Sequence, residues 1–539
     1  MQPLPRLRPS VLAFLVAAAA ALPAQQGDGL QALAGGPAID PQDPGAGPAN
    51  RAWVADPVSV RVRMSYEGTK VNDRERLGLF GLHFDLLDIW SAIPGLYAHV
   101  GGYGAAGGGR GGLFTGGFGL GWRYDLGDDL ELDANLFFGA GGGGNAPQGS
   151  GLMVREALGL EYAVNQRLGL RVEAANIEFP DGDIGGRQVV AGLSWKGRPW
   201  IARNDIDAVR AYPATPAPEP SRIRASLSGT SYQPFNQARR TNGRRLTDDI
   251  GLIGVRGDWF LDRRFFVTMS VHGALTGDVD GYAQLFGGLG YALPLGWGID
   301  LEGALRLGAG GGGGVDTGGG FLAQPTLGLR ANFNPTTSFA IQGGRLYSLN
   351  GTFDAEVITA ELGFTTNTIS YSPGIPGLRV PDGTPLSLWQ VEVKNRTYFP
   401  AAGTTLKSGQ GMKTVHALGL GLAYPLAWDL DFTGEGFGAW AGDIGGYAEG
   451  WFGLRLRHGF RRLPGTEGIL GVAVGAGGGG GVDVGDGLLF NGRAGLGWLL
   501  SPSSALELTL GYTDAYNGGF GAYTVQLGMS YRFALPVAH

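Results

Sequence analysis

GAGGGGGVD, which starts at Gly308 and again at Gly475, is the stretch that decides the fold of this chain. A related run, GAGGGGN, starts at Gly139, so the three runs are almost evenly spaced. The residues that follow each run also match, and they read GLMVREALGLEYAV from Gly151, GFLAQPTLGLRANF from Gly320 and GLLFNGRAGLGWLL from Gly487. So long a period, with strand-like sequence inside it, predicts a whole β-sheet module copied three times.

The composition is rich in glycine but is not that of a disordered chain. Glycine accounts for 101 of 539 residues, while 10% of the residues are aromatic and alternate with the glycines. The formal net charge of −6 provides no basic field that could collect phosphates, which argues against a nucleic-acid partner. The absence of cysteine excludes disulfides, thiol catalysis and cysteine-ligated zinc.

The N-terminal segment has the pattern of an export signal. Arg6 and Arg8 precede the apolar run 11–22 (VLAFLVAAAAAL), and small residues follow it. The run is too short to cross a bilayer as a helix. Residues 1–24 are therefore predicted to be a signal peptide. Residues 25–56, rich in Gly, Pro and Ala, are predicted to be a leader without strands.

Large apolar residues alternate with glycine or charge in the fourth strand-like segment of each copy. In the third copy, Phe452 and Leu454 share one face while Gly453 and Arg455 share the other. Bulky residues would crowd the interior of a small barrel, whereas glycines and a few charges fit there. The pattern therefore favours a transmembrane β-barrel with apolar side chains facing lipid and polar ones facing the lumen.

Connection lengths agree with that pattern. The sixth connection of each copy is tight (VNQR, NPTTS and SPSSA), as periplasmic turns are. The first is long (EGTKVNDRER, QPFNQARRTNGRRLTDD and FPAAGTTLKSGQGMK), as outer loops are. The glycine runs fall in the fifth connection, which is predicted to be an outer loop.

The last strand-like segment, Gln526-Leu-Gly-Met-Ser-Tyr-Arg-Phe533, resembles the β-signal of Gram-negative outer-membrane proteins. The four defined positions of that signal are occupied by Gln526, Gly528, Tyr531 and Phe533. In those families the barrel-insertion machinery reads this segment, so the resemblance implies insertion into the outer membrane of a Gram-negative bacterium. The sequence departs from the pattern because ALPVAH follows Phe533. Each copy is also similar in size and strand number to the eight-stranded OmpA/OmpX-type barrels.

The predicted fold class is thus all-β: a transmembrane antiparallel up-and-down β-barrel architecture in three repeats of about eight strands each. The repeats span residues 57–196, 221–367 and 386–539, and the proline-bearing linkers 197–220 and 368–385 separate them. Three tandem small barrels suit the linkers and the glycine-rich faces. One barrel of about 24 strands is the alternative, because only the C-terminus carries a good insertion signal.

Acidic residues recur at matching places in the outer loops, within GDVDGYAQ from Gly277 and GDIGGYAE from Gly442. Oxygen-rich loops can bind Ca²⁺ weakly, so one hypothesis is a weak hard-cation site. Its ligands would be Asp278, Asp280 and Asp316, with Asp443 and Asp483 as the counterpart in the third copy. The alternative, which the turn chemistry of Asp-Gly favours, is that these residues only form turns.

Pairs of carboxylates recur on strands predicted to line the lumen. As i, i+2 neighbours they face the same way and could serve acid–base chemistry. A charge network with arginines is the favoured interpretation, because a filled lumen admits no substrate. The predicted lumen charges are Glu131, Asp133, Asp300, Glu302, Arg306, Asp429, Asp431, Arg455 and Arg457.

The remaining sequence patterns do not indicate a specific binding or catalytic site. The glycine runs satisfy G-x-G-x-x-G trivially, and a phosphate site would need a strand–turn–helix context. The 6 histidines neither cluster at metal-ligand spacing nor recur between copies. No catalytic residue and no cofactor is therefore predicted. Arg239, Arg240, Arg244 and Arg245 form a basic cluster that could meet lipopolysaccharide phosphates, although a solvated loop is the favoured interpretation.

The predicted function is non-enzymatic. We expect an integral outer-membrane protein with a structural role, or a surface-interaction role through its glycine-rich outer loops. The predicted partners are outer-membrane lipid and lipopolysaccharide, and the barrel-insertion machinery during biogenesis. The alternatives are a porin-like passive channel formed by one wide barrel and an outer-membrane lipid-modifying enzyme.

Overall fold

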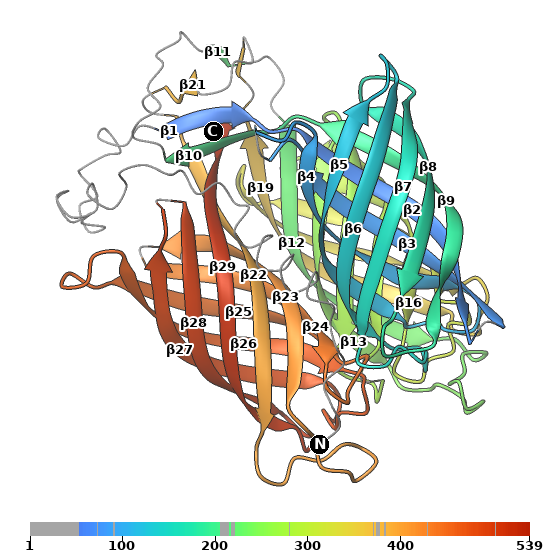
Figure 1. Ribbon diagram of the computed structural model, residues 1–539. Coiled ribbons are helices and arrows are strands. Elements are labelled where there is room, and N and C mark those ends of the chain that lie inside the picture. Colours follow the sequence, from blue (N-terminus) through green and yellow to red (C-terminus); the bar gives the residue numbers. More distant parts are fainter. Residues whose placement is uncertain are drawn as a thin grey trace.

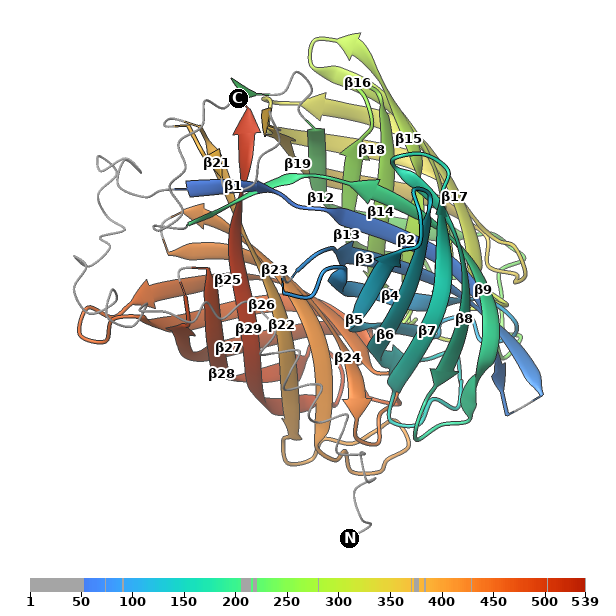
Figure 2. The ribbon, with the colours of Figure 1, turned by 45° about the horizontal axis from the view of Figure 1, so that its top comes forward.

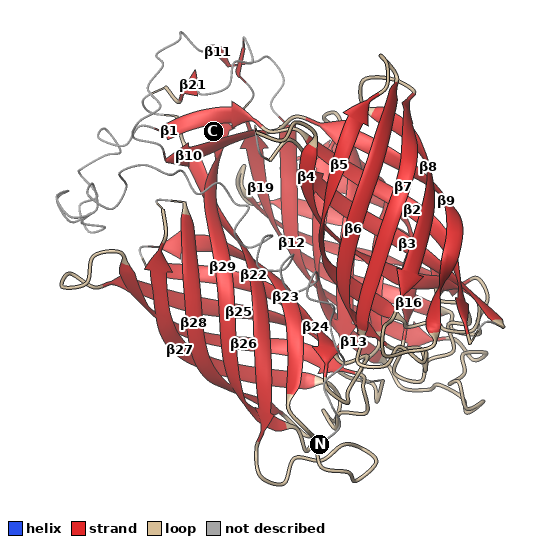
Figure 3. Ribbon diagram, viewed as in Figure 1, coloured by secondary structure: helices blue, strands red, loops and turns tan. Residues whose placement is uncertain are grey.

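A computed structural model describes residues 53–72, 74–89, 92–204, 215–216, 221–279, 281–369, 371–372, 378–381, 384–427, 429–501 and 503–538. Every regular element within these ranges is a β-strand (Figure 3). Among the same residues no helix is long and apolar enough to cross a membrane. The predicted signal peptide and almost all of the predicted leader lie outside the described residues.

Strands β2 to β9 form a closed barrel, named barrel 1 here (Figure 1). Its last strand pairs with its first, for example through Met64 and Leu193. The strands are β2 (Val60–Val71), β3 (Glu75–Leu86), β4 (Leu96–Gly107), β5 (Phe114–Asp125), β6 (Leu130–Gly142), β7 (Leu152–Ala163), β8 (Leu168–Glu178) and β9 (Ile184–Gly197).

Two further runs of strands return on themselves in the same way, and are named barrel 2 and barrel 3. In barrel 2, β12 pairs with β19 through Leu227 and Leu362. Its strands are β12 (Ser221–Pro234), β13 (Ile250–Phe260), β14 (Phe265–Ala274), β15 (Ala283–Gly296), β16 (Ile299–Gly311), β17 (Phe321–Asn332), β18 (Thr337–Ser348) and β19 (Ala355–Thr368).

In barrel 3, β22 pairs with β29 through Val393 and Met529. Its strands are β22 (Leu386–Pro400), β23 (Val415–Ala427), β24 (Leu430–Ala441), β25 (Ala448–Gly459), β26 (Thr466–Gly478), β27 (Leu488–Leu499), β28 (Ser504–Ala515) and β29 (Gly521–Ala538). All pairings within the barrels are antiparallel, so the prediction of an all-β antiparallel barrel architecture is confirmed.

The two faces of each strand differ as the alternation predicts. Leu289 on β15 points outward and is 62% exposed, whereas Arg306 on β16 points inward and is 1% exposed. Val172 is likewise exposed on the outer face of barrel 1, and Leu470 and Leu510 are exposed on the outer face of barrel 3. Glycines on the inner face leave room for large side chains, since a Cβ on Gly290 would lie only 2.2 Å from the Phe266 ring.

Tight turns end the strands at one side of the molecule. In the sixth connection of each barrel, the side-chain oxygen of Asn165, Asn334 or Ser501 accepts hydrogen bonds from backbone amides two and three residues later. Asp262 does the same between β13 and β14, with distances of 2.6 and 2.7 Å to the amides of Arg264 and Phe265, and these bonds lower the pKa of Asp262. Such local acceptors stabilise two-strand turns.

The first connection of barrel 1 differs from the prediction of a long loop. Strand β2 continues to Val71 and β3 begins at Glu75, so most of EGTKVNDRER is strand. The pairs Thr69–Leu77 and Lys70–Arg76 belong to the continuous ladder between these two strands. The corresponding connections of barrels 2 and 3, residues 235–249 and 401–414, are long loops as predicted.

Short strands occupy segments that the sequence indicated only as leader and linkers. β1 (Trp53–Pro57) pairs with β10 (Trp200–Asn204) and with β21 (Leu378–Arg379), and β11 (Thr215–Pro216) pairs with β20 (Tyr371–Ser372). β10 also contacts β29 at Ala534. These strands lie at the end of the molecule where the C-terminus lies (Figures 1 and 2). They pack Ala55, Trp200 and Leu378 into a small buried cluster.

Candidate functional site

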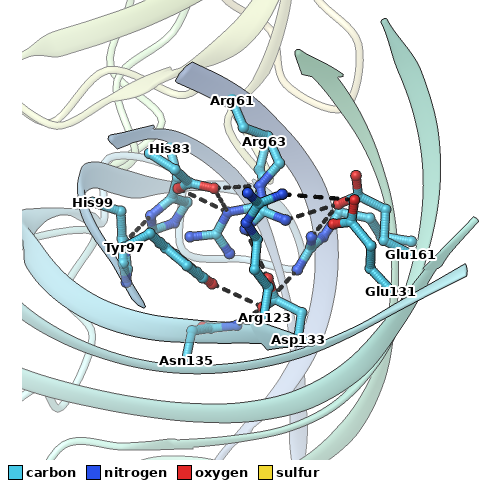
Figure 4. Close-up of polar contacts among 12 residues, drawn as sticks. Arg61, Arg63, His83, Tyr97, His99, Arg123, Glu131, Asp133, Asn135 and Glu161 are labelled. Atoms are coloured by element: carbon cyan, nitrogen blue, oxygen red, sulfur yellow. Dashed lines mark hydrogen bonds and ion pairs between the residues drawn. The ribbon is translucent and has the colours of Figure 1, made fainter. Parts of the chain in front are cut away.

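The interior of barrel 1 is filled by a network of charged side chains (Figure 4). Arg61 is fully buried and contacts three carboxylates, with distances of 2.6 Å to Asp85, 2.7 Å to Asp133 and 3.0 Å to Glu161. The hydroxyl of Tyr97 donates to the Asp133 carboxylate at 2.8 Å. Because every charge has an opposite partner, the network can be buried without isolated charges.

Barrels 2 and 3 contain networks of the same kind. In barrel 2, Arg330 contacts Glu302 at 2.9 Å and Glu361 at 2.6 Å. In barrel 3, Arg455 contacts Asp431 at 3.0 Å and also pairs with Glu392. These charges cross the interior from one strand to distant ones, so each barrel is plugged by its own side chains.

Little space remains inside barrel 1. The cavity beside His83, Tyr103 and Arg155 has a volume of about 10 Å³. That is room for one water molecule at most. A substrate or a stream of ions would have to displace the ion pairs to pass through the interior of barrel 1.

The predicted lumen charges divide into three groups. Asp133, Glu302, Arg306, Asp431 and Arg455 are buried in the networks. Glu131 and Arg457 lie nearer the barrel ends, where Glu131 contacts Lys196 at 2.5 Å and Arg457 contacts Asp431 at 2.8 Å.

Asp300 and Asp429 lie at the mouths of their barrels, not inside them. Asp300 accepts a hydrogen bond from the Asn332 side chain at 2.9 Å, and Asp429 contacts His458 at 2.9 Å. Both residues stand next to turns, where the strand has only just entered the barrel. The i, i+2 carboxylate pairs therefore do not meet as two buried groups, and the acid–base interpretation gains no support.

Sequence reasoning missed most members of the networks. The first strand of each barrel carries charges on its inward face, such as Arg61 and Arg63 in VRVR and Lys394 and Arg396 in VEVKNR. Other members that were not predicted are Glu67, Asp85, Arg155, Glu161, Arg171, Glu173, Arg224, Arg256, Asp258, Arg330, Glu361, Glu392, Glu435, Glu449, Arg493 and Glu507. The signal that could have found them is charge in every second position of a β-strand.

The described carboxylates of the predicted cation site form ion pairs or hydrogen bonds with neighbouring groups of the protein. Asp278 contacts Arg240 at 3.1 Å, and Asp443 pairs with Lys413. Asp316 accepts from the Thr352 hydroxyl at 2.9 Å, and Asp483 accepts from the amide of Gly519 at 3.0 Å. Within the described ranges no three acidic or histidine residues come close enough to hold a metal, and Asp280 lies outside them. The cation site remains a prediction without geometric support.

The basic cluster on the loop 235–249 is partly neutralised. Arg240 is engaged by Asp278, and the Arg239 guanidinium donates to the carbonyl oxygens of Asn236 at 2.8 Å and Ala238 at 3.0 Å. Arg244 and Arg245 are exposed. A solvated loop therefore remains the simpler interpretation.

The segment that resembles an insertion signal lies on β29. Gln526 and Gly528 face the interior, where Gln526 accepts from Arg396 at 2.7 Å. Tyr531 and Phe533 stack with ring centroids 6.5 Å apart. The residues after Phe533, which depart from the signal pattern, continue the strand: Leu535 and Pro536 pair with β22 and Val537 pairs with β19.

Parts of the glycine runs contact neighbouring barrels, which the sequence did not predict. Each run contacts the loop between the third and fourth strands of another barrel. Gly312 in the run of barrel 2 lies against Gly112 of barrel 1, and Gly479 in the run of barrel 3 lies against Gly281 of barrel 2. Gly143 in the run of barrel 1 lies against Gly446 of barrel 3, which closes the cycle. A Cβ on Gly281 or Gly446 would lie 2.8 Å from the facing backbone nitrogen. The Gln148 side chain adds a hydrogen bond to the carbonyl of Gly445 at 2.9 Å. Glycine is required because backbone meets backbone.

A large cavity lies between the three barrels. Its volume is about 3440 Å³, and its walls are formed by outward-facing side chains of all three, including Met64, Phe84, Val255, Leu289, Leu420 and Phe432. The glycine runs line one end. The other end lies near the tight turns and is lined by Trp195, Trp259 and Trp389. The rings of Trp195 in barrel 1 and Trp259 in barrel 2 contact each other, with centroids 4.8 Å apart.

No family model and no curated protein matches the chain. Among solved structures, OpdL of Pseudomonas aeruginosa is 11% identical, and the match covers 90% of this chain and 99% of that one, with a TM-score of 0.21. The outer membrane protein OpdK of the same species is 10% identical over 89% and 98%, with a TM-score of 0.23. Its siderophore receptor PirA is 11% identical over 88% and 81%, with a TM-score of 0.25. At scores this low the chain is assigned to no family.

Proposed function

We propose that this chain is an integral outer-membrane protein without enzymatic activity, in which three small barrels are held together as one structural unit. The observation that carries the proposal is the inverted arrangement of side chains, with apolar residues outside and paired charges inside. A water-soluble barrel would bury its apolar face instead. Strands such as β8 (11 residues) and β28 (12 residues) are also long enough to cross the hydrocarbon core when tilted.

The glycine runs support a structural role within this unit. Because they join neighbouring barrels, the surface contacts with lipopolysaccharide or other partners fall to the remaining outer loops, chiefly 235–249 and 401–414. The insertion segment on β29 supports export and assembly by the barrel-insertion machinery of a Gram-negative outer membrane.

Spin labels at single cysteines test the membrane assignment, since the chain has no cysteine of its own. We expect labels at Val172→Cys and Leu510→Cys to be relaxed by lipid-soluble oxygen and shielded from a water-soluble nickel chelate. Ser408→Cys, on an outer loop, serves as the control that the chelate reaches. Access of the chelate to Val172→Cys and Leu510→Cys would contradict the proposal.

A porin-like passive channel is the second candidate, and the inter-barrel cavity is the observation that favours it. Any route would run between the barrels, because the ion pairs obstruct the barrel interiors. The apolar walls of the cavity disfavour a continuous water column.

We therefore expect the purified protein to give no large, long-lived conductance steps in planar bilayers. A known porin reconstituted in the same bilayers serves as the control. Large steps from this protein would favour the channel and oppose the structural role.

A further inference from the structure

We propose that the cavity between the barrels is a lipid-binding site that holds the acyl chains of glycerophospholipid from the inner leaflet. This inference rests on the proposed membrane location of the barrels. It goes beyond that location because it assigns an occupant to the space between the three barrels.

The walls of the cavity have the chemistry of a lipid-facing surface. The lining side chains belong to the same outward-facing rows that elsewhere form the outer surface, such as Val255 on β13, Leu289 on β15 and Leu420 on β23. No ion-pair network like those inside the barrels crosses this space in the residues that the structure describes. Apolar molecules are therefore its natural content.

The size of the cavity argues that it is occupied. At about 3440 Å³ it is larger than the typical site for a small ligand, which has a volume of about 300–1,000 Å³. The energetic penalty of an empty apolar cavity rises with its volume, because its walls lose their packing partners. Water would find few hydrogen-bonding partners on these walls, whereas flexible acyl chains can fill an irregular apolar volume.

The two ends of the cavity indicate which leaflet supplies the lipid. At the outer-loop end, the three glycine contacts bring the barrels together so that backbone meets backbone. Arg110 and Arg240 line this end, but each is already paired with a carboxylate, Glu75 and Asp278 respectively. At the opposite end the lining includes Trp195, Trp259 and Trp389, together with the polar residues Asn334 and Asn367. Tryptophan is typical of the level where acyl chains give way to head groups. A phospholipid fits this arrangement when its head group lies at the turn end and its acyl chains extend toward the glycine contacts.

Two glycines in the cavity wall allow the site to be filled by mutation. Gly257 on β13 and Gly287 on β15 line the cavity, and a Cβ on either would meet nothing within 4 Å. Gly492 on β27 has the same open surroundings but does not line the cavity, so it provides a matched control. None of the three has a positive φ, so a side chain introduces no backbone strain.

The full chain is purified from outer membranes in mild detergent, washed extensively, and its retained lipid is measured by mass spectrometry of an organic extract. We expect the wild type and Gly492→Trp to retain phospholipid in fixed proportion to protein. We expect the double variant Gly257→Trp and Gly287→Trp to retain less phospholipid per protein, because the two indoles occupy part of the cavity volume.

Equal lipid in all three proteins would overturn the inference, as would retention of lipopolysaccharide in place of phospholipid. The spin-label measurement distinguishes these failures from failure of the membrane proposal. Labels at Val172→Cys and Leu510→Cys that remain in lipid while no phospholipid is retained would overturn only the cavity site.

Discussion

Arg61→Ala is expected to lower the free energy of unfolding of barrel 1 by about 3–5 kcal/mol, because it removes one partner of a buried charge cluster. Arg61 is fully buried and contacts Asp85, Asp133 and Glu161. Arg63 and Arg171 still contact these carboxylates after its loss, but the network is left with an excess of negative charge in a space that holds little water. The effect is measured by urea titration of the folded protein in detergent, followed through tryptophan fluorescence.

Two further variants separate charge from geometry. Arg61→Lys keeps the charge but loses the planar fork, so we expect a smaller loss than that of Arg61→Ala. Lys413→Ala removes a cation whose partner, Asp443, is also exposed, and it is expected to change the free energy of unfolding by about 1 kcal/mol or less. Equal effects of Arg61→Ala and Lys413→Ala would show that the interior network does not stabilise the barrel.

Gly281→Val is expected to destabilise the junction between barrels 2 and 3 by about 2–4 kcal/mol, because the new side chain adds backbone strain and overpacking. The φ of Gly281 is +78°, and its Cβ would lie 2.8 Å from the backbone nitrogen of Gly479. The measurement is crosslinking across this junction between paired cysteines, together with the thermal melt.

Gly314→Val is the matched control for this prediction. Gly314 belongs to a glycine run and has a φ of +72°, but a Cβ there would meet nothing within 4 Å. It therefore carries the backbone strain without the collision. We expect its crosslinking yield to equal that of the wild type and its melt to fall by less than that of Gly281→Val. Loss of crosslinking in both variants would refute the role of close backbone packing.

The strands and their two faces could be predicted from sequence, because alternation is a local signal. Leu289 and Arg306 lie on the faces that a period of two assigns to them. The tight turns at Asn334 and Ser501 could be predicted for the same reason. The sequence could predict that charged residues pair inside the barrels, but not which residues pair. Arg61 contacts Glu161 across the closed barrel, and no local pattern specifies the register that brings them together.

The role of the glycine runs could not be predicted. Polyglycine is equally typical of a free loop and of close backbone packing, and the partner of Gly479 is Gly281, far away in the chain. The short strands β1 and β10 were missed because each gains its hydrogen bonds from a distant segment. Their sequences alone resemble linkers.

The cyclic order of the glycine contacts has a consequence for how the protein can change over time. In a ring of three separate, identical subunits, every substitution at the contact surface would appear three times at once. Here the ring is made by one polypeptide, so each seam is encoded separately and can be altered while the other two stay intact. The arginines at 239, 240, 244 and 245 on only one outer loop illustrate the freedom that this covalent design allows.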